Sequence, residues 1–418
     1  MYCSKYKNNY SSLNSKSYLC LILLLLIIFN YSCSTTKRFE KSEFDTSIKS
    51  DKLIRVLISE SKKFKILLES ESEIVDKNGK RINVEKNSSV QFIFSNKGIK
   101  ILVNEKEFRS QEFLIFPPIN NYLQFNGKKY RGLFKLVSNS TSILLINYLD
   151  IEDYVKGVIL MEMPLGKGND NYEAIKAFSI LARTFALKRK IHSKDSFDLY
   201  SDTRDQVYGG IDSENEISNS LVDFTKGQIL SYENNIATVF YHSTCGGYTE
   251  NVENVFNSNP FPYLVSLKDD NPPNCKISPR FDWEEKLSNQ IIAKRLFESK
   301  LISDKNSIIK KIEIVSRFES GRVNKLKITV LEYKMEKEIE LYSNNIRFVL
   351  KNSRGKILPS SNFQISTSGN NFVFKGIGFG HGVGMCQWGA INLSRNGKSY
   401  LEILNHYFPK TEIKKLYD

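Results

Sequence analysis

The chain has 418 residues and a formal net charge of +14, and 41% of its residues are hydrophobic. This length allows two or three structural units, and the hydrophobic share excludes wholesale disorder. The positive charges are scattered and do not alternate with aromatic residues along any stretch, so no nucleic-acid partner is expected.

Residues 1–33 have the pattern of a secretory signal. Three lysines precede the apolar run "YLCLILLLLIIF", and no acidic residue occurs before Glu40. The run is too short for a confident membrane span. "FNYSCS" places a small residue before Cys33, as in a lipoprotein cleavage site. We therefore expect an exported, cell-envelope protein that is anchored to the membrane by lipidation of Cys33. Ordinary signal cleavage and an uncleaved anchor are the alternatives.

Residues 34–50 are polar and are predicted to be a tether. From 51 to 145, short β-prone runs such as "SVQFIFS" and "IKILVN" alternate with turn residues, which predicts a β-rich N-terminal unit. The remaining residues, 146–418, are predicted to form a second region.

Two helices are expected at the start of that region. The first is "DIEDYVKGVILMEMP", with Asp150 as its N-cap and Pro164 as its stop signal. The second is "DNYEAIKAFSILARTFALKRK", which has an apolar stripe at helical spacing and opens with Asp170 and Glu173 in the pattern of a capping box.

Beyond the second helix the sequence alternates between strand and helix signals. "KKIEIVSRFESGRVNKLKITVLEY" predicts a hairpin, while "MCQWGAINLSRNG" and "YLEILNHYF" predict two short helices. The order of elements indicates an α+β fold rather than regular βαβ alternation.

Glu162 is the acidic residue with the most informative position. In a helix it shares one face with Val155 and Ile159, where an apolar residue would be expected. Burial and the negative end of the helix dipole would both raise its pKa, as a general acid for glycosidic cleavage requires. The alternative is a glutamate that points into water from a frayed helix end.

Two other stretches contain residues that could bind or react. Arg183 and Thr184 interrupt the apolar stripe of the second helix, which suits either substrate binding or a structural ion pair. "HSTCGGYTE" lacks the glycines that flank the serine in a nucleophile elbow, so a Ser–His–Asp hydrolase is weakly supported.

The stretch "FKGIGFGHGVGMCQWGA", residues 374–390, contains six glycines. Their spacing fits neither the dinucleotide-binding fingerprint nor a phosphate-binding loop. Alternating glycines instead suggest a backbone that approaches another surface closely. His381 in this stretch could bind substrate or orient an acid, or it could be hydrogen-bonded within a tight turn.

Five stretches together resemble the SpoIID/LytB family, which includes stage II sporulation protein D lytic transglycosylases and amidase enhancers. They occur in the family's order between about residues 146 and 390: "YLDIEDYVKGVILMEMP", "AIKAFSILARTFAL", "DQVYGG", "HSTCGGYTENVENVF" and "GFGHGVGMCQWGA". The resemblance implies a protein that acts on peptidoglycan.

The family's catalytic glutamate falls on Glu162. The implied reaction is cleavage of the bond between N-acetylmuramic acid and N-acetylglucosamine in peptide-free strands, with a 1,6-anhydro product and no cofactor. The implied partners are glycan strands and a cell-wall amidase, and a non-catalytic wall-binding protein is the alternative. The candidate substrate-binding residues are Arg183, Thr184, Gln206, Tyr208, Ser243, Gly246, Gly247, His381, Gly382 and Gln387.

Some clostridial relatives have a zinc site before the "QVY" block. His192 is present here, but Tyr200, Arg204 and Asp205 stand where the other ligands would align, so that site is expected to be absent.

The cysteines after Cys33 are Cys245, Cys275 and Cys386, and their spacing matches no metal motif. A Cys245–Cys386 disulfide, which suits an exported protein, is favoured over free thiols and over zinc.

Overall fold

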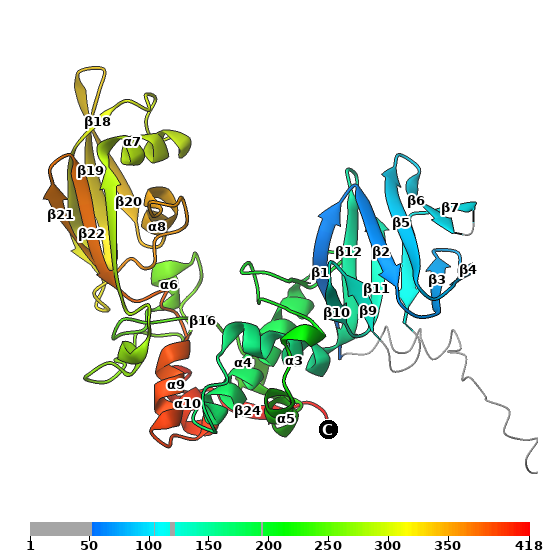
Figure 1. The fold of residues 1–418 in the computed structure, drawn as a ribbon. Helices are drawn as coiled ribbons and strands as arrows, with labels where there is room; N and C mark the ends of the chain where they lie inside the picture. Colours follow the sequence, from blue (N-terminus) through cyan, green and yellow to red (C-terminus); the bar gives the residue numbers. More distant parts are fainter. Residues whose placement is uncertain (1–51, 104, 118–121, 194) are drawn as a thin grey trace, which may run out of the picture. The chain divides into compact units, whose positions relative to one another are not determined.

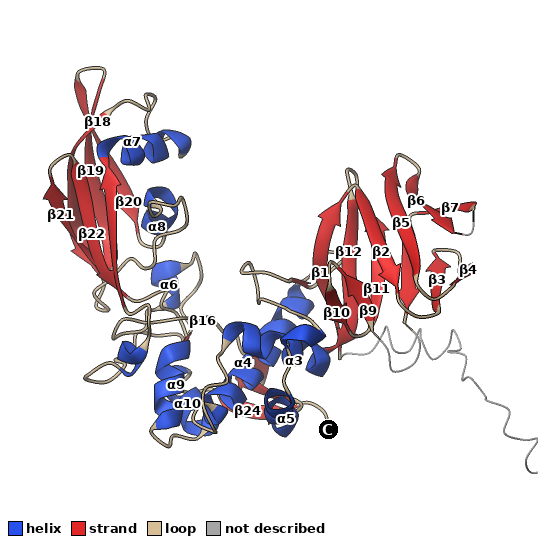
Figure 2. Ribbon diagram, viewed as in Figure 1, coloured by secondary structure: helices blue, strands red, loops and turns tan. Residues whose placement is uncertain are grey.

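The structure is a computed structural model that describes residues 52–103, 105–117, 122–193 and 195–418. The expected signal segment, Cys33 and the tether lie outside the described residues. The helices and strands confirm the expected α+β class (Figures 1 and 2).

The first part of the described chain is β-rich, as predicted. Its strands are β1 Leu53–Ser61, β2 Lys63–Leu68, β3 Ser72–Asp76, β4 Arg81–Val84, β5 Ser88–Ser95, β6 Gly98–Val103, β7 Lys106–Ser110, β8 Glu112–Phe116, β9 Leu123–Phe125, β10 Lys128–Tyr130, β11 Leu133–Ser138 and β12 Ile143–Asp150. A later strand, β13 Leu199–Tyr200, pairs in parallel with β1.

These strands form two sheets. One has the order β13-β1-β12-β11-β8-β3-β4 and the other the order β10-β9-β2-β5-β6-β7. Buried and exposed residues alternate strictly along β2, so one face of that strand is in the core. Phe92 of β5 and Phe113 of β8 meet edge to face, with ring centroids 6.1 Å apart, which places the shared core between the two sheets.

The two predicted helices follow β12 directly. Helix α3 spans Ile151–Glu162, and the Asp150 side chain accepts a hydrogen bond from the amide of Glu152, so the predicted N-cap is confirmed. Met163 is extended before Pro164 and ends the helix, as expected.

Helix α4 spans Tyr172–His192, but its predicted capping box is wrong. Asn171 is the N-cap and makes no side-chain capping bond. The Glu173 carboxylate instead binds Lys176 and accepts a hydrogen bond from the amide of Tyr400, because tertiary contacts outcompete the local cap.

The rest of the chain forms small sheets and short helices. The strands are β14 Gln228–Tyr232, β15 Asn235–Ile236, β16 Tyr241–His242, β17 Asp282–Ser288, β18 Ile308–Arg317, β19 Val323–Glu332, β20 Met335–Tyr342, β21 Phe363–Ser368, β22 Asn371–Ile377, β23 Met385–Cys386 and β24 Glu412–Lys415. The helices are α5 Glu216–Phe224, α6 Val252–Val255, α7 Asn289–Glu298, α8 Asn345–Leu350, α9 Gln387–Arg395 and α10 Tyr400–Tyr407, with 3-10 turns η1 Ile211–Ser213 and η2 Asn274–Ile277.

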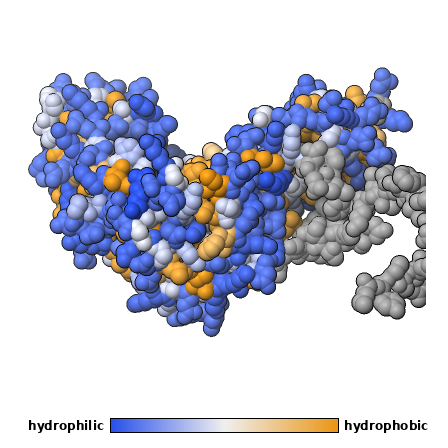
Figure 3. Space-filling view, turned by 60° about the horizontal axis from the view of Figure 1, so that its bottom comes forward, coloured by the Kyte–Doolittle hydropathy of each residue, from blue (hydrophilic) through white to orange (hydrophobic). Residues whose placement is uncertain are grey.

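Strands β17 to β22 and helices α7 and α8 enclose a second hydrophobic core, separate from the one that contains α3 and α4. The predicted hairpin is confirmed as β18 and β19, and the predicted C-terminal helices are α9 and α10. On the face seen in Figure 3, hydrophilic residues dominate and hydrophobic ones form small groups between them. No helix within the described ranges is long and apolar enough to cross a membrane.

The glycine-rich stretch follows β22 and runs beside the "HSTCGGYTE" segment. Phe379 and Thr244 exchange two backbone hydrogen bonds, and β23 pairs in parallel with β16. A Cβ at Gly384 would overlap the carbonyl oxygen of Phe240. The expected close approach of this backbone to another surface is therefore confirmed.

Gly384→Ala is expected to destabilise the protein by about 2–4 kcal/mol, because a left-handed φ and a backbone overlap act together. Gly384 has a φ of +71°. Gly369→Ala is the matched control, since Gly369 also has a positive φ of +59° but no neighbour within 4 Å of the place that a Cβ would occupy. The Gly369→Ala control should lower the free energy of unfolding by about 1 kcal/mol. Equal urea midpoints for the two variants would contradict the packing argument.

Candidate functional site

Glu162 is the last residue of α3, and its side chain is half-buried. Its Oε1 accepts a hydrogen bond of 2.9 Å from the backbone amide of Val207. The Gln387 side-chain amide donates to the Glu162 carbonyl oxygen at 3.0 Å and lies 3.4 Å from Oε2. Residues from α3, the loop before η1 and the start of α9 therefore converge on one carboxyl group.

The electrostatic setting of Glu162 favours its protonated form. Burial raises its pKa above the ordinary value, while the hydrogen bonds from Val207 and Gln387 and the nearby Tyr241 hydroxyl oppose that shift only in part. This is the direction expected from the position of Glu162 on the apolar face of its helix.

Tyr241 of β16 is a neighbour that sequence reasoning missed. Its hydroxyl is buried, and the nearby Glu162 charge helps raise its pKa well above the usual range. The hydroxyl influences the carboxyl group but does not reach full hydrogen-bond geometry. The only available sequence signal was its position directly before His242, in a segment predicted as strand.

Gln206 directly precedes Val207, the residue whose amide binds Glu162. It is fully buried, and its carbonyl oxygen accepts a hydrogen bond of 3.2 Å from the hydroxyl of Tyr154 on α3. Its amide nitrogen has no hydrogen-bond partner, although the side chain influences the pKa of Tyr241. Gln206 is therefore held in the protein interior by its bond to Tyr154.

Asp205 is a second carboxylate whose charge affects Tyr241. Its carboxylate is occupied by an ion pair with Arg189 at 2.9 Å and by the amide of Tyr200 at 2.8 Å. Arg204 lies over the Tyr200 ring and pairs with Asp202. Of these two carboxyl groups, Asp205 is held by an ion pair, and Glu162 has none among the described contacts.

Arg183 and Thr184 are fully buried within α4. Arg183 binds both carboxylate oxygens of Glu152, at 2.9 and 2.6 Å. The Thr184 hydroxyl donates to the carbonyl of Ile180 and accepts from the amide of Leu230. The ion pair that was the structural alternative for Arg183 is present, and neither side chain faces solvent.

Several other candidate substrate-binding residues also face the interior. The Tyr208 hydroxyl donates to Asn147, and its ring packs against Gly157 of α3. Gly246 and Gly247 are buried, and Gly382 lies against the guanidinium of Arg322. Close packing explains these residues without a ligand.

His381 and Ser243 lie along the junction of β16 with the glycine-rich stretch. His381 Nδ1 accepts a hydrogen bond from the amide of Val383, and its ring is 5.6 Å from that of His242. Burial, with His242, Arg347 and Arg322 nearby, lowers the pKa of His381 well below its usual value, so it is neutral. Ser243 is half-exposed, and its carbonyl accepts from the amide of Trp388.

The expected Cys245–Cys386 disulfide is wrong for this structure. Cys245, Cys275 and Cys386 are all free and buried. The Cys245 sulfur lies 3.3 Å from the Cys275 sulfur and 3.2 Å from Asp269 Oδ2. Folding brings the third cysteine into the group, so the pairing of two could not be inferred from their positions in the chain.

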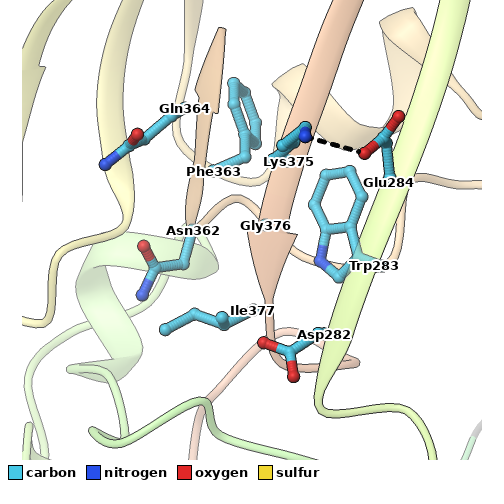
Figure 4. A pocket seen from close by; sticks show the side chains of 9 residues that line it. All are labelled: Asp282, Trp283, Glu284, Asn362, Phe363, Gln364, Lys375, Gly376 and Ile377. Atoms are coloured by element: carbon cyan, nitrogen blue, oxygen red, sulfur yellow. Dashed lines mark ion pairs between the residues drawn. The ribbon is translucent and has the colours of Figure 1, made fainter.

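A separate pocket of about 560 Å³ lies on the sheet formed by β17, β22 and β21. Figure 4 shows Trp283 beside Gly376, with the Lys375–Glu284 ion pair at one side. None of the candidate site residues from the sequence lines it.

Comparisons with known proteins place the chain in a family. A family model described as stage II sporulation protein matches residues 139–232, and one described as a domain of unknown function matches residues 267–384. Stage II sporulation protein D of Bacillus amyloliquefaciens is 30% identical over 66% of this chain and 77% of its own length. The chain belongs to the SpoIID family.

Two further relatives extend the comparison. An uncharacterised protein of Brachyspira hyodysenteriae is 31% identical over 78% of this chain and 82% of its own length. The amidase enhancer of Bacillus subtilis is 26% identical over 70% of this chain, but the match spans only 45% of that longer protein. The SpoIID match at 139–232 contains Glu162 and Val207, whereas Gln387 lies outside it.

Proposed function

We propose that this SpoIID-family chain acts on the bacterial cell wall as a lytic transglycosylase that cleaves glycan strands lacking stem peptides. One observation supports this most strongly. Glu162 is a half-buried carboxyl group with a raised pKa, held by Val207 and Gln387 and not by a cation in the described contacts. A protonated carboxyl group near neutral pH is what glycosidic cleavage needs.

In the proposed mechanism Glu162 acts twice. Its protonated carboxyl group donates a proton to the glycosidic oxygen as the bond from that oxygen to C1 of the muramic residue breaks. The resulting carboxylate then takes the proton of the 6-hydroxyl of the same sugar, whose oxygen bonds to C1. The product is a 1,6-anhydro sugar, no water is consumed, and the glutamate is protonated again. Hydrolytic glycosidases use a second carboxylate, and this route does not require one.

The surroundings of Glu162 suit both of its states. The Val207 amide and the Gln387 side chain can donate to the carboxylate after it has lost its proton. Burial raises the pKa of Glu162, which favours the protonated form that the first step needs. The same residue can therefore serve as acid and then as base.

We also propose that the chain is exported and held at the membrane through Cys33. The lysine-rich start followed by an apolar run and a small residue before Cys33 supports this. Loss of the signal segment would remove Lys5, Lys7 and Lys16 and no acidic residue, so the net charge of +14 would fall to +11, which still favours contact with anionic wall polymers or lipids.

A second candidate function is assistance to a cell-wall amidase without glycan cleavage. The similarity to a protein named amidase enhancer favours it. The two candidates differ in whether this chain alone makes new glycan ends.

Product analysis tests the proposal. The full-length chain in mild detergent is incubated with intact peptidoglycan and with amidase-stripped peptidoglycan, and the products are identified by mass spectrometry. Anhydro-muramyl ends from the stripped strands are expected. Reducing ends would indicate hydrolysis instead, and strand binding without any product would favour the amidase helper.

The pH dependence of cleavage should show an alkaline limb set by Glu162. Because the acid must be protonated, the rate is expected to fall as the pH rises through the raised pKa of Glu162. Gln387→Leu removes a hydrogen bond that lowers this pKa, so the limb should move to higher pH. Gln364→Leu, an exposed glutamine away from Glu162, is the control and should leave the profile unchanged. A limb that stays in place in Gln387→Leu would show that another group controls it.

A further inference from the structure

Four side chains that can each lose a proton meet in the interior from distant parts of the sequence. They are Cys245 after β16, Asp269 in the following loop, Cys275 in η2 and Cys386 at the end of β23. One ligand atom from each lies within 4.8 Å of all the others, and all four residues are buried.

The separations are a few tenths of an ångström shorter than those around a tetrahedral zinc ion, so a small outward movement of the side chains would admit the metal. Zn–S bonds of about 2.3 Å at tetrahedral angles put two sulfurs about 3.8 Å apart, and a sulfur and a carboxylate oxygen about 3.5 Å apart. Here Cys245 Sγ is 3.3 Å from Cys275 Sγ and 3.2 Å from Asp269 Oδ2. We propose that Cys245, Asp269, Cys275 and Cys386 form a structural zinc site.

Hydrogen bonds around the four ligands hold them in place. Backbone amides of Cys245 and Gly389 point at the sulfur of Cys386, at 3.2 and 3.4 Å. The amide of Gly247 points at the sulfur of Cys245, at 3.4 Å. Such N–H donors stabilise thiolates, which are the form that binds metal.

The carboxylate is also oriented from outside the cluster. Tyr407 of α10 donates its hydroxyl proton to Asp269 Oδ1 at 3.0 Å, and the amide of Cys275 donates to Oδ2 at 3.0 Å. Partners of this kind fix the direction of a ligating carboxylate. Residues outside the four proposed ligands therefore hold the Asp269 carboxylate in the direction that metal binding requires.

The charges also balance in part. Three thiolates and one carboxylate around Zn²⁺ leave two negative charges on the site. The buried guanidinium of Arg322 donates to the carbonyl oxygens of Cys245 and Tyr248, at 2.6 and 2.9 Å, and its charge acts on all three cysteines. A buried anionic cluster needs such compensation.

The site would position the groups around Glu162. Cys386 precedes Gln387, which contacts Glu162, and β23 pairs with β16, which contains Tyr241. Four protein ligands complete a tetrahedral shell and leave no open position for substrate, which is typical of structural zinc. Zinc here would stabilise the frame of the Glu162 site without taking part in chemistry.

Metal content tests the site independently of any glycan cleavage. The full-length chain is purified in mild detergent with Cys3, Cys20 and Cys33 replaced by serine, so that only the three clustered cysteines remain. Elemental analysis is expected to find about one zinc per chain. Cobalt exchange should give the intense visible bands of a tetrahedral ion and a thiolate charge-transfer band.

Two variants separate ligation from general stability. Cys275→Ser should lose the thiolate charge-transfer intensity of one ligand and most of the zinc. Tyr407→Phe keeps the ring and removes only the bond to Asp269, so zinc affinity should fall about 10–100-fold. Tyr263→Phe is the matched control, because Tyr263 is equally buried and its hydroxyl instead accepts a bond from the Thr238 amide.

Three results would overturn the proposal. One is an intact mass two units lower with no zinc, which would show a disulfide within the cluster. Another is three titratable thiols with neither zinc nor a cobalt spectrum. The third is equal zinc affinity in the Tyr407 and Tyr263 variants, which would show that the bond from Tyr407 to Asp269 does not support a metal ligand.

Discussion

Glu162→Gln is expected to abolish formation of anhydro-muramyl ends, with the cleavage rate falling about 1000-fold or more. General acid–base catalysis contributes roughly 10²–10⁴-fold, and in the proposed mechanism one carboxyl group acts as both acid and base. The glutamine side chain keeps an oxygen that can accept the hydrogen bond from the Val207 amide, so the local fold should survive. Mass spectrometry of products from stripped strands measures the effect.

Glu112→Gln is the matched control for that variant. Glu112 is also half-buried, and it pairs with Lys135 in the N-terminal sheet, away from α3. The Glu112→Gln variant should cleave glycan strands at the rate of the unaltered chain. If Glu162→Gln cleaved as fast as this control, the assignment of Glu162 as the acid would be wrong even if the chain is a transglycosylase.

Arg183→Met is expected to lower the free energy of unfolding by about 3–5 kcal/mol, the usual effect of breaking a buried ion pair. Glu152 would remain buried, with acceptor bonds only from the Gly227 amide and the Tyr417 hydroxyl. Urea unfolding followed by circular dichroism measures the loss. Adding Glu152→Gln to the same chain removes the unpaired buried charge and should recover part of the lost free energy of unfolding.

Arg204→Met is the control for the loss of an arginine. Arg204 pairs with Asp202 at the surface, and exposed pairs contribute about 0–1 kcal/mol. A stable Arg183→Met protein with weakened glycan binding would contradict the structural role and restore the substrate-binding interpretation.

The helix that ends at Glu162 was predictable because its signals are local. Asp150 caps the first turn and Pro164 prevents helical geometry at Met163, and both effects act within a few residues. The periodic burial of that helix then indicated a carboxyl group with a raised pKa. Gln387 was among the candidates only through family resemblance, since its contact with Glu162 joins segments 225 residues apart.

Other patterns allowed two tertiary outcomes, and only the folded chain separates them. A charged residue in an apolar stripe is compatible with a ligand site or with a buried ion pair, and only the position of Glu152 distinguishes them for Arg183. The expected capping box of α4 was lost because Glu173 found partners in Lys176 and α10. Local propensity is a weak prior when long-range contacts compete.

Residue order and periodicity, which depend on nearest-neighbour geometry, were enough to predict the α+β class and the bounds of α3 to within a residue or two, and they led to Glu162 as the proposed acid. The family followed from the linear order of the motifs. Chain folding placed Tyr241 beside Glu162 and gathered, across as many as 141 residues, three cysteines with Asp269, a residue that no spacing rule picked out. Such contacts depend on the pairing of strands β16 and β23 and on the packing of segments that are far apart in the sequence. No local pattern in the chain encodes these long-range contacts.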